Sequence, residues 1–475
     1  MKRYSITLLI LACISMRALA YDFEADGIYY YIRSQSTSPE VFVSSCSQPE
    51  YNCYSGDVVI PETVTYEGVT YTVTQILSYA FKNCTELTSV SIPNTITTIM
   101  QFAFLGCTSL DFIHIPNSVT SLDRTAFNNT GWFNNQPDGC ILYLDGWCLG
   151  PKTDASFVEL SIDEGTLRVA ERAFYGCETL VSVTLPNSLI SISPYAFEHC
   201  FELRHVDFGE SIAEILYGAF EGCHSLEEVV LPASVTMVES FVFEGCSSLS
   251  NLFLPNSITT IGEYAFEGCT SLTHVTLPNA ITEIKTGVFE RSGLKAITIP
   301  EGVTTIGSDA FYACDSLTSV TIPQTMTIIK TGAFLNDQSL ATVTCLGCVP
   351  AVLDITPPIT SFDESCNATL IVPCGCVDIY GSSDWGEVFG QIIEDCSNTL
   401  EQQLAISVYP NPTIVKVHIE GIEPTEVLVY NALGQLVKTV RGTNEINVGD
   451  LPEGMYLLRI TNKEGNAYLE KIVKE

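Results

Sequence analysis

The chain has 475 residues, of which 46% are hydrophobic and 16% are charged, against ~25% charged residues in an average globular protein. This composition excludes a disordered chain. Acidic residues number 55 and basic residues 21, giving a net charge of −34. A field of that sign repels phosphate backbones and anionic lipid heads, which argues against nucleic-acid binding and polybasic membrane attachment.

Residues 1–20 have the features of a signal peptide. Lys2-Arg3 is a basic start, the stretch Ile6 to Ile14 is apolar, and Ala18 and Ala20 are small residues at the two places that a signal peptidase needs. We therefore expect a mature start at position 21 and an oxidising compartment that permits disulfides.

Two alternatives for this segment remain. A transmembrane anchor needs ~20 apolar residues, and Arg17 cuts the run short. The run Ile10-Leu11-Ala12-Cys13 loosely resembles a lipobox, which would make a lipoprotein, although no acidic residue follows it. No later apolar stretch is long enough to span a bilayer.

Residues 21–75 favour a strand-rich N-terminal cap. Stretches of β-branched and aromatic residues run over Ile28–Ile32, Val41–Ser44, Asp57–Ile60 and Val64–Val73, with a turn at Glu67-Gly68.

The centre of the chain is a repeat of the pattern Ala-Phe-x-x-Cys-x-x-Leu. A degenerate copy, Leu160–Ile162 followed by Leu167 and Val169, falls in the one long gap between phenylalanines and makes about twelve copies. A fixed period of 20–29 residues predicts stacked coils that share a continuous core. The phenylalanines lie 22 or 23 residues apart on either side of that gap, at Phe81, Phe104 and Phe127, then at Phe174, Phe197, Phe220, Phe243, Phe266, Phe289, Phe311 and Phe334.

One copy shows how each coil is expected to fold. Leu272, Val275 and Leu277 are expected to point inward from a short strand. Pro278 ends that strand because it has no N–H. Ile281 and Ile284 return to the core on a second extended piece. The Ala-Phe-x-x-Cys segment then turns the corner as one helical turn. Twelve such coils would form a parallel sheet ~55 Å long, in which every inner strand is hydrogen-bonded to both neighbours.

This pattern resembles the BspA-like, or type 5, leucine-rich repeat family over about residues 76–344, with an insertion near 130–157. The resemblance implies a secreted or surface-attached bacterial protein. Several members are adhesins that bind host matrix or plasma proteins, and they are not enzymes. Residues 21–32 also look like the family's N-terminal entry, and residues 345–396, with Leu370–Pro373, Tyr380, Trp385 and Phe389, look like its C-terminal cap.

A separate module closes the chain. Residues 397–405 read as a linker, and 406–475 as short strands of a small β-sandwich. The module resembles the type A sorting domain of the type IX secretion system, which implies an export signal that is recognised by that machinery at the outer membrane of a Gram-negative bacterium and is usually removed. The alternative is an extra immunoglobulin-like binding domain. The residues that carry the sorting motifs are Tyr409, Pro410, Asn411, Pro412, Gly434, Gly454, Tyr456 and Lys471.

Of the 19 cysteines, Cys13 lies in the signal segment, and the other 18 fall into two classes. Eight occupy one repeat column, from Cys84 to Cys314, and are interpreted as a ladder of buried small hydrophobic residues. Ten others lie in the caps and the insertion, where disulfides would close less supported segments. Cys46–Cys53 and Cys140–Cys148 are plausible local pairs, and the six in 345–396 allow fifteen connectivities. The candidate disulfide cysteines are Cys46, Cys53, Cys140, Cys148, Cys345, Cys348, Cys366, Cys374, Cys376 and Cys396.

A zinc cage is the alternative for part of that set. Cys345-x-x-Cys348 with Cys374-x-Cys376 has ligand spacing that zinc accepts. In an exported protein we favour disulfides, and we expect no metal and no cofactor.

The sequence holds no motif of a known catalytic site: it has no His-Glu-x-x-His, no Gly-x-Ser-x-Gly, no phosphate loop and no dinucleotide fingerprint. Since His205 and His274 are three coils apart, ~15 Å separates them, which is too far to share a metal. We therefore expect no enzyme activity.

The remaining functional candidates are outward positions of the strands on the expected concave face. An exposed aromatic side chain on a polar sheet is a candidate anchor for a partner, although single exposed apolar residues are common. A second column, Glu198, Glu221, Glu244, Glu267 and Glu290, is interpreted as a solvated convex stripe rather than a Ca²⁺ site. The candidate ligand-binding residues are Phe112, His114, His205, Asp207, Glu228, Asn251, Phe253 and His274.

Three functions follow from these expectations. The leading one is an exported, surface-displayed or secreted binding protein that engages an extracellular protein or glycan through the curved sheet. The second is a structural or self-associating surface component with no discrete ligand, and the third is an enzyme with an unusual site.

Overall fold

The computed structural model describes residues 21–33, 38–46, 52–153, 156–354, 360–363, 367–396, 407–409, 413, 415–420, 423–431, 436–463 and 467–474. The predicted signal peptide therefore lies outside the described residues. The chain forms two compact units, residues 1–394 and 395–475, and each is described by itself.

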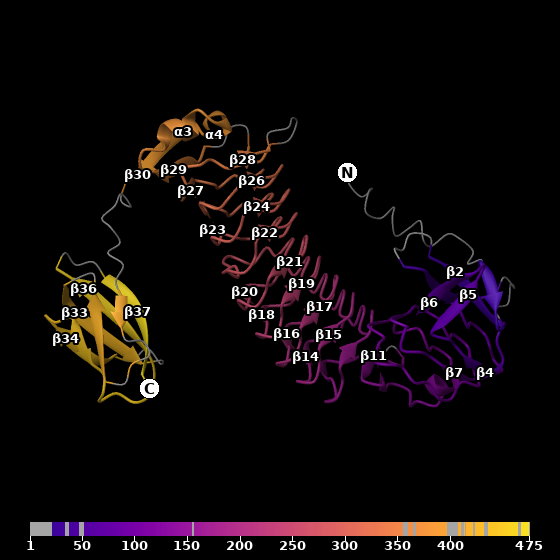
Figure 1. The fold of residues 1–475 in the computed structure, drawn as a ribbon. Helices are drawn as coiled ribbons and strands as arrows, with labels where there is room; N and C mark the ends of the chain where they lie inside the picture. The colour runs from indigo at the N-terminus through magenta and orange to yellow at the C-terminus, as the bar shows by residue number, and fades with distance from the viewer. Residues whose placement is uncertain are drawn as a thin grey trace. The chain divides into compact units, whose positions relative to one another are not determined.

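The first unit is a β-solenoid of about 14 coils. Each regular coil contributes a two-residue strand and a three-residue strand, and the two kinds form two separate rows (Figure 1). The two-residue row includes β13 (Arg168–Val169), β15 (Ser191–Ile192), β17 (Glu214–Ile215), β19 (Met237–Val238) and β21 (Thr260–Ile261) in consecutive parallel pairing, and β22 (Glu283–Ile284), β24 (Thr305–Ile306), β26 (Ile328–Ile329) and β28 (Val352–Leu353) continue the same pattern.

The second row carries the longer strands. Its members alternate one inward residue with outward ones, as the period of 2 predicts. They are β12 (Glu159–Ser161), β14 (Ser182–Thr184), β16 (His205–Asp207), β18 (Glu228–Val230), β20 (Asn251–Phe253), β23 (Ala296–Thr298), β25 (Ser319–Ile322), β27 (Thr342–Cys345), β29 (Thr369–Pro373) and β30 (Gln391–Asp395).

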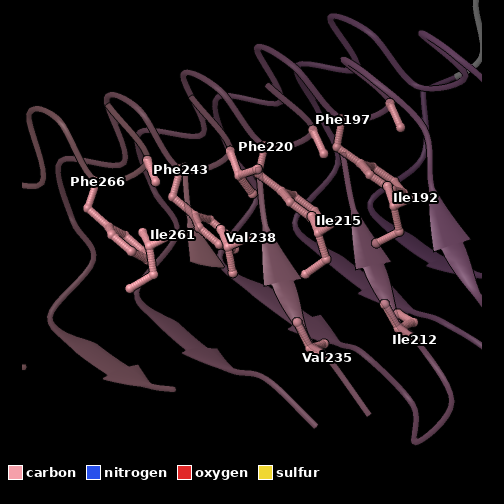
Figure 2. Packing of buried hydrophobic residues seen from close by; sticks show 14 of the residues in the cluster. Ile192, Phe197, Ile212, Ile215, Phe220, Val235, Val238, Phe243, Ile261 and Phe266 are labelled. Carbon is pink, nitrogen blue, oxygen red and sulfur yellow. The ribbon is translucent and has the colours of Figure 1, made fainter. Parts of the chain in front are cut away.

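The core is a ladder of stacked phenylalanines. Figure 2 shows Phe266, Phe243, Phe220 and Phe197 in a row across the view, one in each coil, with Ile261, Val238, Ile215 and Ile192 of the two-residue strands beside them. The ring centroids of Phe197 and Phe220 are 5.2 Å apart with an angle of 2° between the rings. Every ring in the series from Phe81 to Phe334 is at most 1% exposed. Close repetition of one ring at one place in each coil therefore fills the interior from end to end.

The corner that carries the phenylalanine has its own hydrogen bonds between coils. The Phe266 N–H donates to Val288 O in the next coil (2.9 Å), and the Gly268 N–H donates to Glu290 O (2.8 Å). Gly268 has φ +70°, a left-handed conformation that explains why glycine so often precedes the cysteine. The corner is a turn closed by i→i+3 bonds, such as Cys269 N–H to Phe266 O (3.4 Å), rather than a turn of α-helix.

The cysteine column completes this corner. The Cys223 thiol donates to Phe197 O of the preceding coil (3.2 Å), and Cys246 and Cys269 repeat the contact with Phe220 O and Phe243 O. A thiol fits here because it is small and apolar and still offers a weak donor to a buried carbonyl. Burial raises the pKa of the Cys314 thiol to about 12, which leaves it protonated and able to donate.

The expectation of an uninterrupted three-residue row is wrong at three places. β16 and β18 are not hydrogen-bonded as a strand pair, and two coils lack the strand altogether. Residues 111–115 and 273–277 form no strand. In the first, the Ile115 N–H donates to the Asp145 carboxylate (2.7 Å) instead of a neighbouring strand. The second lies beside the coil in which the repeat shortens to 22 residues, and there a Cβ on Gly293 would lie 2.1 Å from Thr270 O. The row is therefore divided where the coil geometry changes.

The insertion leaves the solenoid between two coils that remain bonded to each other. Asp123 and Glu171 form an isolated parallel bridge, and the Glu171 N–H donates to Leu122 O (2.9 Å). The extruded chain forms α2 (Gly131–Asn134) and the hairpin of β10 (Ile141–Leu144) and β11 (Trp147–Pro151). The degenerate copy is confirmed as a coil, because β12 and β13 pair in register with β14 and β15.

Both caps extend the aromatic ladder beyond the recognisable repeats. At one end the Tyr54 ring lies against Phe81 with 4.5 Å between the ring centroids and an angle of 40° between the rings. At the other end Phe362 stacks on Phe334 (4.9 Å). The N-terminal cap contains β1 (Phe23–Ala25), β2 (Ile28–Ile32), β3 (Glu40–Ser44), β4 (Gly56–Val59), β5 (Thr63–Tyr66) and β6 (Val69–Ile76), and the first coils contain β7 (Leu87–Ser91), β8 (Thr98–Ile99) and β9 (Ser121–Leu122). These extra coils explain why the solenoid exceeds the twelve copies counted in the sequence.

The C-terminal cap closes the core with aromatic residues. It adds α3 (Val377–Gly381) and α4 (Asp384–Val388). Tyr380, Trp385 and Phe389 are all at most 2% exposed, and the Trp385 indole N–H donates to Ala351 O (2.8 Å).

Two disulfides have defined partners. One joins Cys46 to Cys53, with Cα atoms 5.9 Å apart, and one joins Cys348 to Cys376, with Cα atoms 5.5 Å apart. Cys374 and Cys396 are also disulfide-bonded. Since Cys348 and Cys376 are joined to each other, the alternative zinc cage has lost two of its four thiolates. Cys366 lies outside the described residues.

The expected pair Cys140–Cys148 is wrong. In the β10–β11 hairpin Cys148 lies opposite Tyr143, three residues beyond Cys140, an offset of ~10 Å along the strand. A disulfide needs Cα atoms within ~7 Å. Cys345 is also an unpaired thiol. It is buried on the inner face of β27, and burial raises the pKa of its thiol to about 12.

The second unit is a small β-sandwich with its own core. One sheet holds β31 (Ser407–Tyr409), β32 (Lys416–Glu420) and β35 (Glu445–Asn447), and the other holds β33 (Pro424–Asn431), β34 (Leu436–Arg441), β36 (Gly454–Asn462) and β37 (Ala467–Lys474). Val427, Leu458 and Ile472 are fully buried between them. Of the sorting motif, Gly454 and Tyr456 begin β36 and Lys471 lies opposite Leu457 in β37. Pro410, Asn411, Pro412 and Gly434 lie outside the described residues.

We predict that the phenylalanine ladder carries far more stability than the exposed aromatic residues. Phe266→Ala should lower the free energy of unfolding by ~3–5 kcal/mol, because it leaves a cavity in a stacked core. Phe253→Ala is the matched control, since Phe253 is 58% exposed and should change stability by less than ~0.5 kcal/mol. Urea unfolding of both variants measures the difference, and equal midpoints would contradict the register described above.

Candidate binding surface

Five of the predicted residues lie on three successive strands of the second row, β16, β18 and β20. In β14 and β16 the outward positions Ser182 and His205 lie side by side in register, and in β18 and β20 Glu228 pairs with Asn251. Paired strands are ~4.8 Å apart. β16 and β18 are neighbours without strand pairing, and the polar side chains follow one another in a column along the same face of the coils. Asp207 and Phe253 belong to the adjacent column, which runs along the same face.

The second column contains an exposed apolar pair. Val230 and Phe253 are in register on β18 and β20, and they are 53% and 58% exposed. Val229 and Leu252, the middle residues of these two strands, fill the core. Core packing therefore does not require apolar side chains at Val230 and Phe253. An apolar pair beside His205, Glu228 and Asn251 offers a hydrophobic contact with hydrogen-bonding groups next to it, which is the composition of a recognition surface.

The other predicted residues lie elsewhere. His274 is exposed on the irregular coil next to β20, and its Nδ1 hydrogen-bonds to the Thr273 hydroxyl (2.9 Å). Phe112 and His114 lie on the irregular coil 111–115, beside the insertion, and His114 Nδ1 contacts an Asp145 carboxylate oxygen (3.1 Å). The eight candidates therefore form two separate groups, because the insertion stands between the coils that carry them.

A shallow depression lies beside the second group. Its volume is about 510 Å³, and it is lined by Asp111, Phe112, Ile113, Trp132, Asn135, Gln136 and Leu144. The sequence analysis did not find this feature, since its walls come from a coil and from the insertion. The available signal was Trp132, an aromatic residue in the polar segment 131–138.

The interpretation of the glutamate column as a solvated stripe is wrong. Glu198, Glu221, Glu244 and Glu267 are half-buried, and Glu290 is buried. Arg291 bonds to Glu267 (2.9 Å) and Glu290 (2.7 Å) at one end. Burial is the main cause that raises the pKa of Glu244 to about 8, and repulsion from the neighbouring glutamates adds to it.

A row of aromatic side chains covers these carboxylates. The rings of Tyr217 and Phe241 are 5.0 Å apart, and those of Phe241 and Tyr264 are 5.1 Å apart. Burial and the nearby glutamates raise the pKa of the Tyr264 hydroxyl to about 12. The column is thus part of the packed corner of the coils, where its charges are held close together at a cost in stability.

The repeats match the BspA type leucine rich repeat region at residues 51–136, 152–252 and 236–349, in six copies that together cover more than half of the chain. The chain belongs to the BspA-type leucine-rich repeat family. Residues 407–475 match the secretion system C-terminal sorting domain. The BspA-type protein described here is therefore a secreted or cell-surface repeat protein whose sorting tail implies the secretion machinery as a partner.

Several solved structures are similar to this chain. A leucine-rich cell surface protein from Faecalibacterium prausnitzii is 25% identical, with 68% of this chain and 94% of that protein covered and a TM-score of 0.30. A leucine-rich repeat protein from Bacteroides ovatus is 25% identical with the same coverage and a TM-score of 0.27. The pneumococcal vaccine antigen PcpA is 16% identical, with 78% and 98% covered and a TM-score of 0.33.

No curated protein matches the chain. Among the described residues, none of the helices is both long enough and apolar enough to cross a membrane.

We predict that the glutamate column makes stability depend on pH. The pKa of Glu244 is about 8 in the folded chain against an ordinary value of 4.5, so between these values the folded state holds a proton that the unfolded state lacks. The stability that the protonated form of Glu244 gives the folded state is fully present below pH 4.5, and it is lost as pH rises through about 8. Glu244→Gln should therefore raise the melting temperature more at about pH 9 than at about pH 5.

Glu228→Gln is the matched control, because Glu228 is an exposed glutamate on a strand of the same solenoid. Thermal melts of both variants and the parent at the two pH values provide the comparison. An increase in melting temperature from Glu244→Gln that is equal at both pH values would show that the glutamate column is solvated after all.

Proposed function

We propose that this protein is a non-enzymatic, adhesin-like binding protein displayed on or released from the surface of a Gram-negative bacterium, which engages an extracellular protein or glycan. The binding face is the outward side of β16, β18 and β20. The observation that carries this proposal is the exposed pair of Val230 and Phe253, in register beside His205, Glu228 and Asn251.

The charge of the chain limits the class of partner. At a net charge of −34 an anionic partner is repelled, although this long-range term is screened beyond ~8 Å at physiological salt. The partner is therefore neutral or basic, with an apolar element for Phe253. Self-association into a surface layer is the alternative outcome, and light scattering of the purified protein distinguishes it.

We predict that the sorting tail is required for delivery and not for folding of the solenoid. Deleting residues 406–475 should trap the protein in the periplasm, since the type IX machinery would lack its signal. The melting temperature of the solenoid should stay the same, because the tail has a separate core. Fractionation and thermal melts of the truncated protein test both parts, and normal surface delivery would contradict the assignment of the tail.

We predict that binding to a partner depends on the strand face. A screen of the mature protein against extracellular matrix proteins and glycans identifies the partner. Phe253→Ser combined with His274→Ser should then weaken its affinity about tenfold or more, because an exposed aromatic anchor is lost. The free energy of unfolding should change by less than ~1 kcal/mol, as for other surface changes.

Thr184→Ala is the control on the same face, two coils before β18. It should leave affinity unchanged, since Thr184 lies on the polar part of the row. Unchanged affinity in the Phe253 and His274 double variant would remove the binding site from this face.

A further inference from the structure

The depression beside the insertion, called here the Phe112 depression, has the form of a small-ligand site. It lies where the row of three-residue strands is interrupted, and its walls are the coil 111–113, the segment 132–136 and Leu144. Its volume of about 510 Å³ falls within the ~300–1,000 Å³ typical of ligand sites.

Two aromatic side chains face this hollow from different elements. Phe112 is 87% exposed, the highest value among the large hydrophobic residues described, whereas its neighbours Ile113 and Ile115 are buried in the core. Packing therefore does not account for Phe112. Trp132 is held in place by two contacts. Its backbone N–H donates to Leu110 O (2.9 Å), and its ring packs edge-to-face with the Phe127 ring at an angle of 77°. One aromatic wall is thus anchored and the other is open to solvent.

The polar groups of the depression are positioned by single hydrogen bonds. The Asn135 amide donates to an Asp111 carboxylate oxygen (3.3 Å), and the Gln136 amide donates to Trp132 O (3.2 Å). A carboxamide offers two donor hydrogens and an acceptor oxygen, and a carboxylate accepts about four hydrogen bonds. Each side chain therefore keeps hydrogen-bonding capacity for a ligand while its orientation is fixed.

The chemistry of the lining selects the class of ligand. The lining contains one carboxylate and no basic side chain, and Lys152 of the insertion is bonded to Gln136 O and Asp138. Anions are therefore disfavoured. A wholly apolar ligand would bury the amides without partners. A pyranose ring fits both conditions, because its C–H faces are apolar and its edge carries hydroxyl groups.

We propose that the Phe112 depression binds a neutral carbohydrate, with Phe112 and Trp132 against the faces of the sugar and Asp111, Asn135 and Gln136 on its hydroxyl groups. This inference rests on the proposed function as a binding protein and adds a second site, which is distinct from the face of β16, β18 and β20.

Tryptophan fluorescence provides a direct measurement. The chain has three tryptophans, of which Trp147 and Trp385 are 3% and 1% exposed, whereas Trp132 lines the depression. The full-length mature protein is titrated with maltotriose, cellotriose, mannotriose and chitotriose, and with sialyllactose as an anionic comparison. At least one neutral trisaccharide should give a saturable change that disappears in Trp132→Phe, and calorimetry should give its Kd in both proteins.

Phe112→Ala tests the site itself. It should raise that Kd about 10- to 100-fold, the factor expected when the sugar no longer buries a phenylalanine side chain on binding. The melting temperature should not change, because Phe112 is exposed. Val349→Ala is the control, because Val349 is 80% exposed and does not line the depression, and it should leave the sugar affinity unchanged. Phe253→Ala tests the strand face as the alternative site.

The inference is overturned if no neutral trisaccharide binds at up to about 10 mM, ten times a Kd of ~1 mM, or if Phe112→Ala binds as tightly as the parent. Loss of sugar binding in Phe253→Ala would also overturn it, while supporting the strand face as the site. A protein partner that depends on Phe253, with no sugar bound, would leave the proposed function standing and remove only this second site.

Discussion

The stacking of one phenylalanine per coil is the constraint to which the rest of the solenoid adapts. Rings such as Phe243 and Phe266 repeat at 5.7 Å with nearly parallel planes, so each ring covers the face of the next. Because the rings are fully buried, every coil must return its chain to the same place after 22 or 23 residues. Three features let a coil close within so few residues. They are the left-handed residue before the cysteine, the hydrogen bond from the thiol to a carbonyl, and the short strands.

The same constraint explains where function can be placed. A coil that must present Leu252 to the core and Asn251 and Phe253 outward is free to vary only the outward pair. The solenoid therefore supplies a rigid row of variable positions at the ~4.8 Å spacing of a parallel sheet. Exposed aromatic residues on such a row lose little conformational entropy on binding, since the backbone beneath them is already fixed.

The irregular parts of the molecule concentrate at breaks in the ladder. Between Phe127 and Phe174 the chain leaves the solenoid, and the bridge from Asp123 to Glu171 keeps the stack continuous while the insertion stands outside it. The coil 111–115 then lacks a neighbouring strand, and Asp145 of the insertion supplies the missing acceptor. A hollow with two aromatic walls results. The half-buried glutamates show the opposite situation, in which strict repetition places like charges close together and stability is lost.

The sequence alone determined the repeat, its period, the buried face of each coil and the separate tail, because a period of 23 with one phenylalanine, one cysteine and fixed leucines admits one stacked arrangement. Tertiary structure decided the features that depend on contacts between residues far apart in the sequence. It made Tyr54 and Phe362 continue the row of rings beyond Phe81 and Phe334, although neither residue stands in a copy of the Ala-Phe-x-x-Cys pattern. It buried Glu244, whose surroundings come from other coils and aromatic residues. It separated Cys140 from Cys148 through the hairpin register, and it brought Trp132 to Phe112 across 20 residues of chain, because side chains from an extruded loop meet a coil only after the solenoid has closed around the gap.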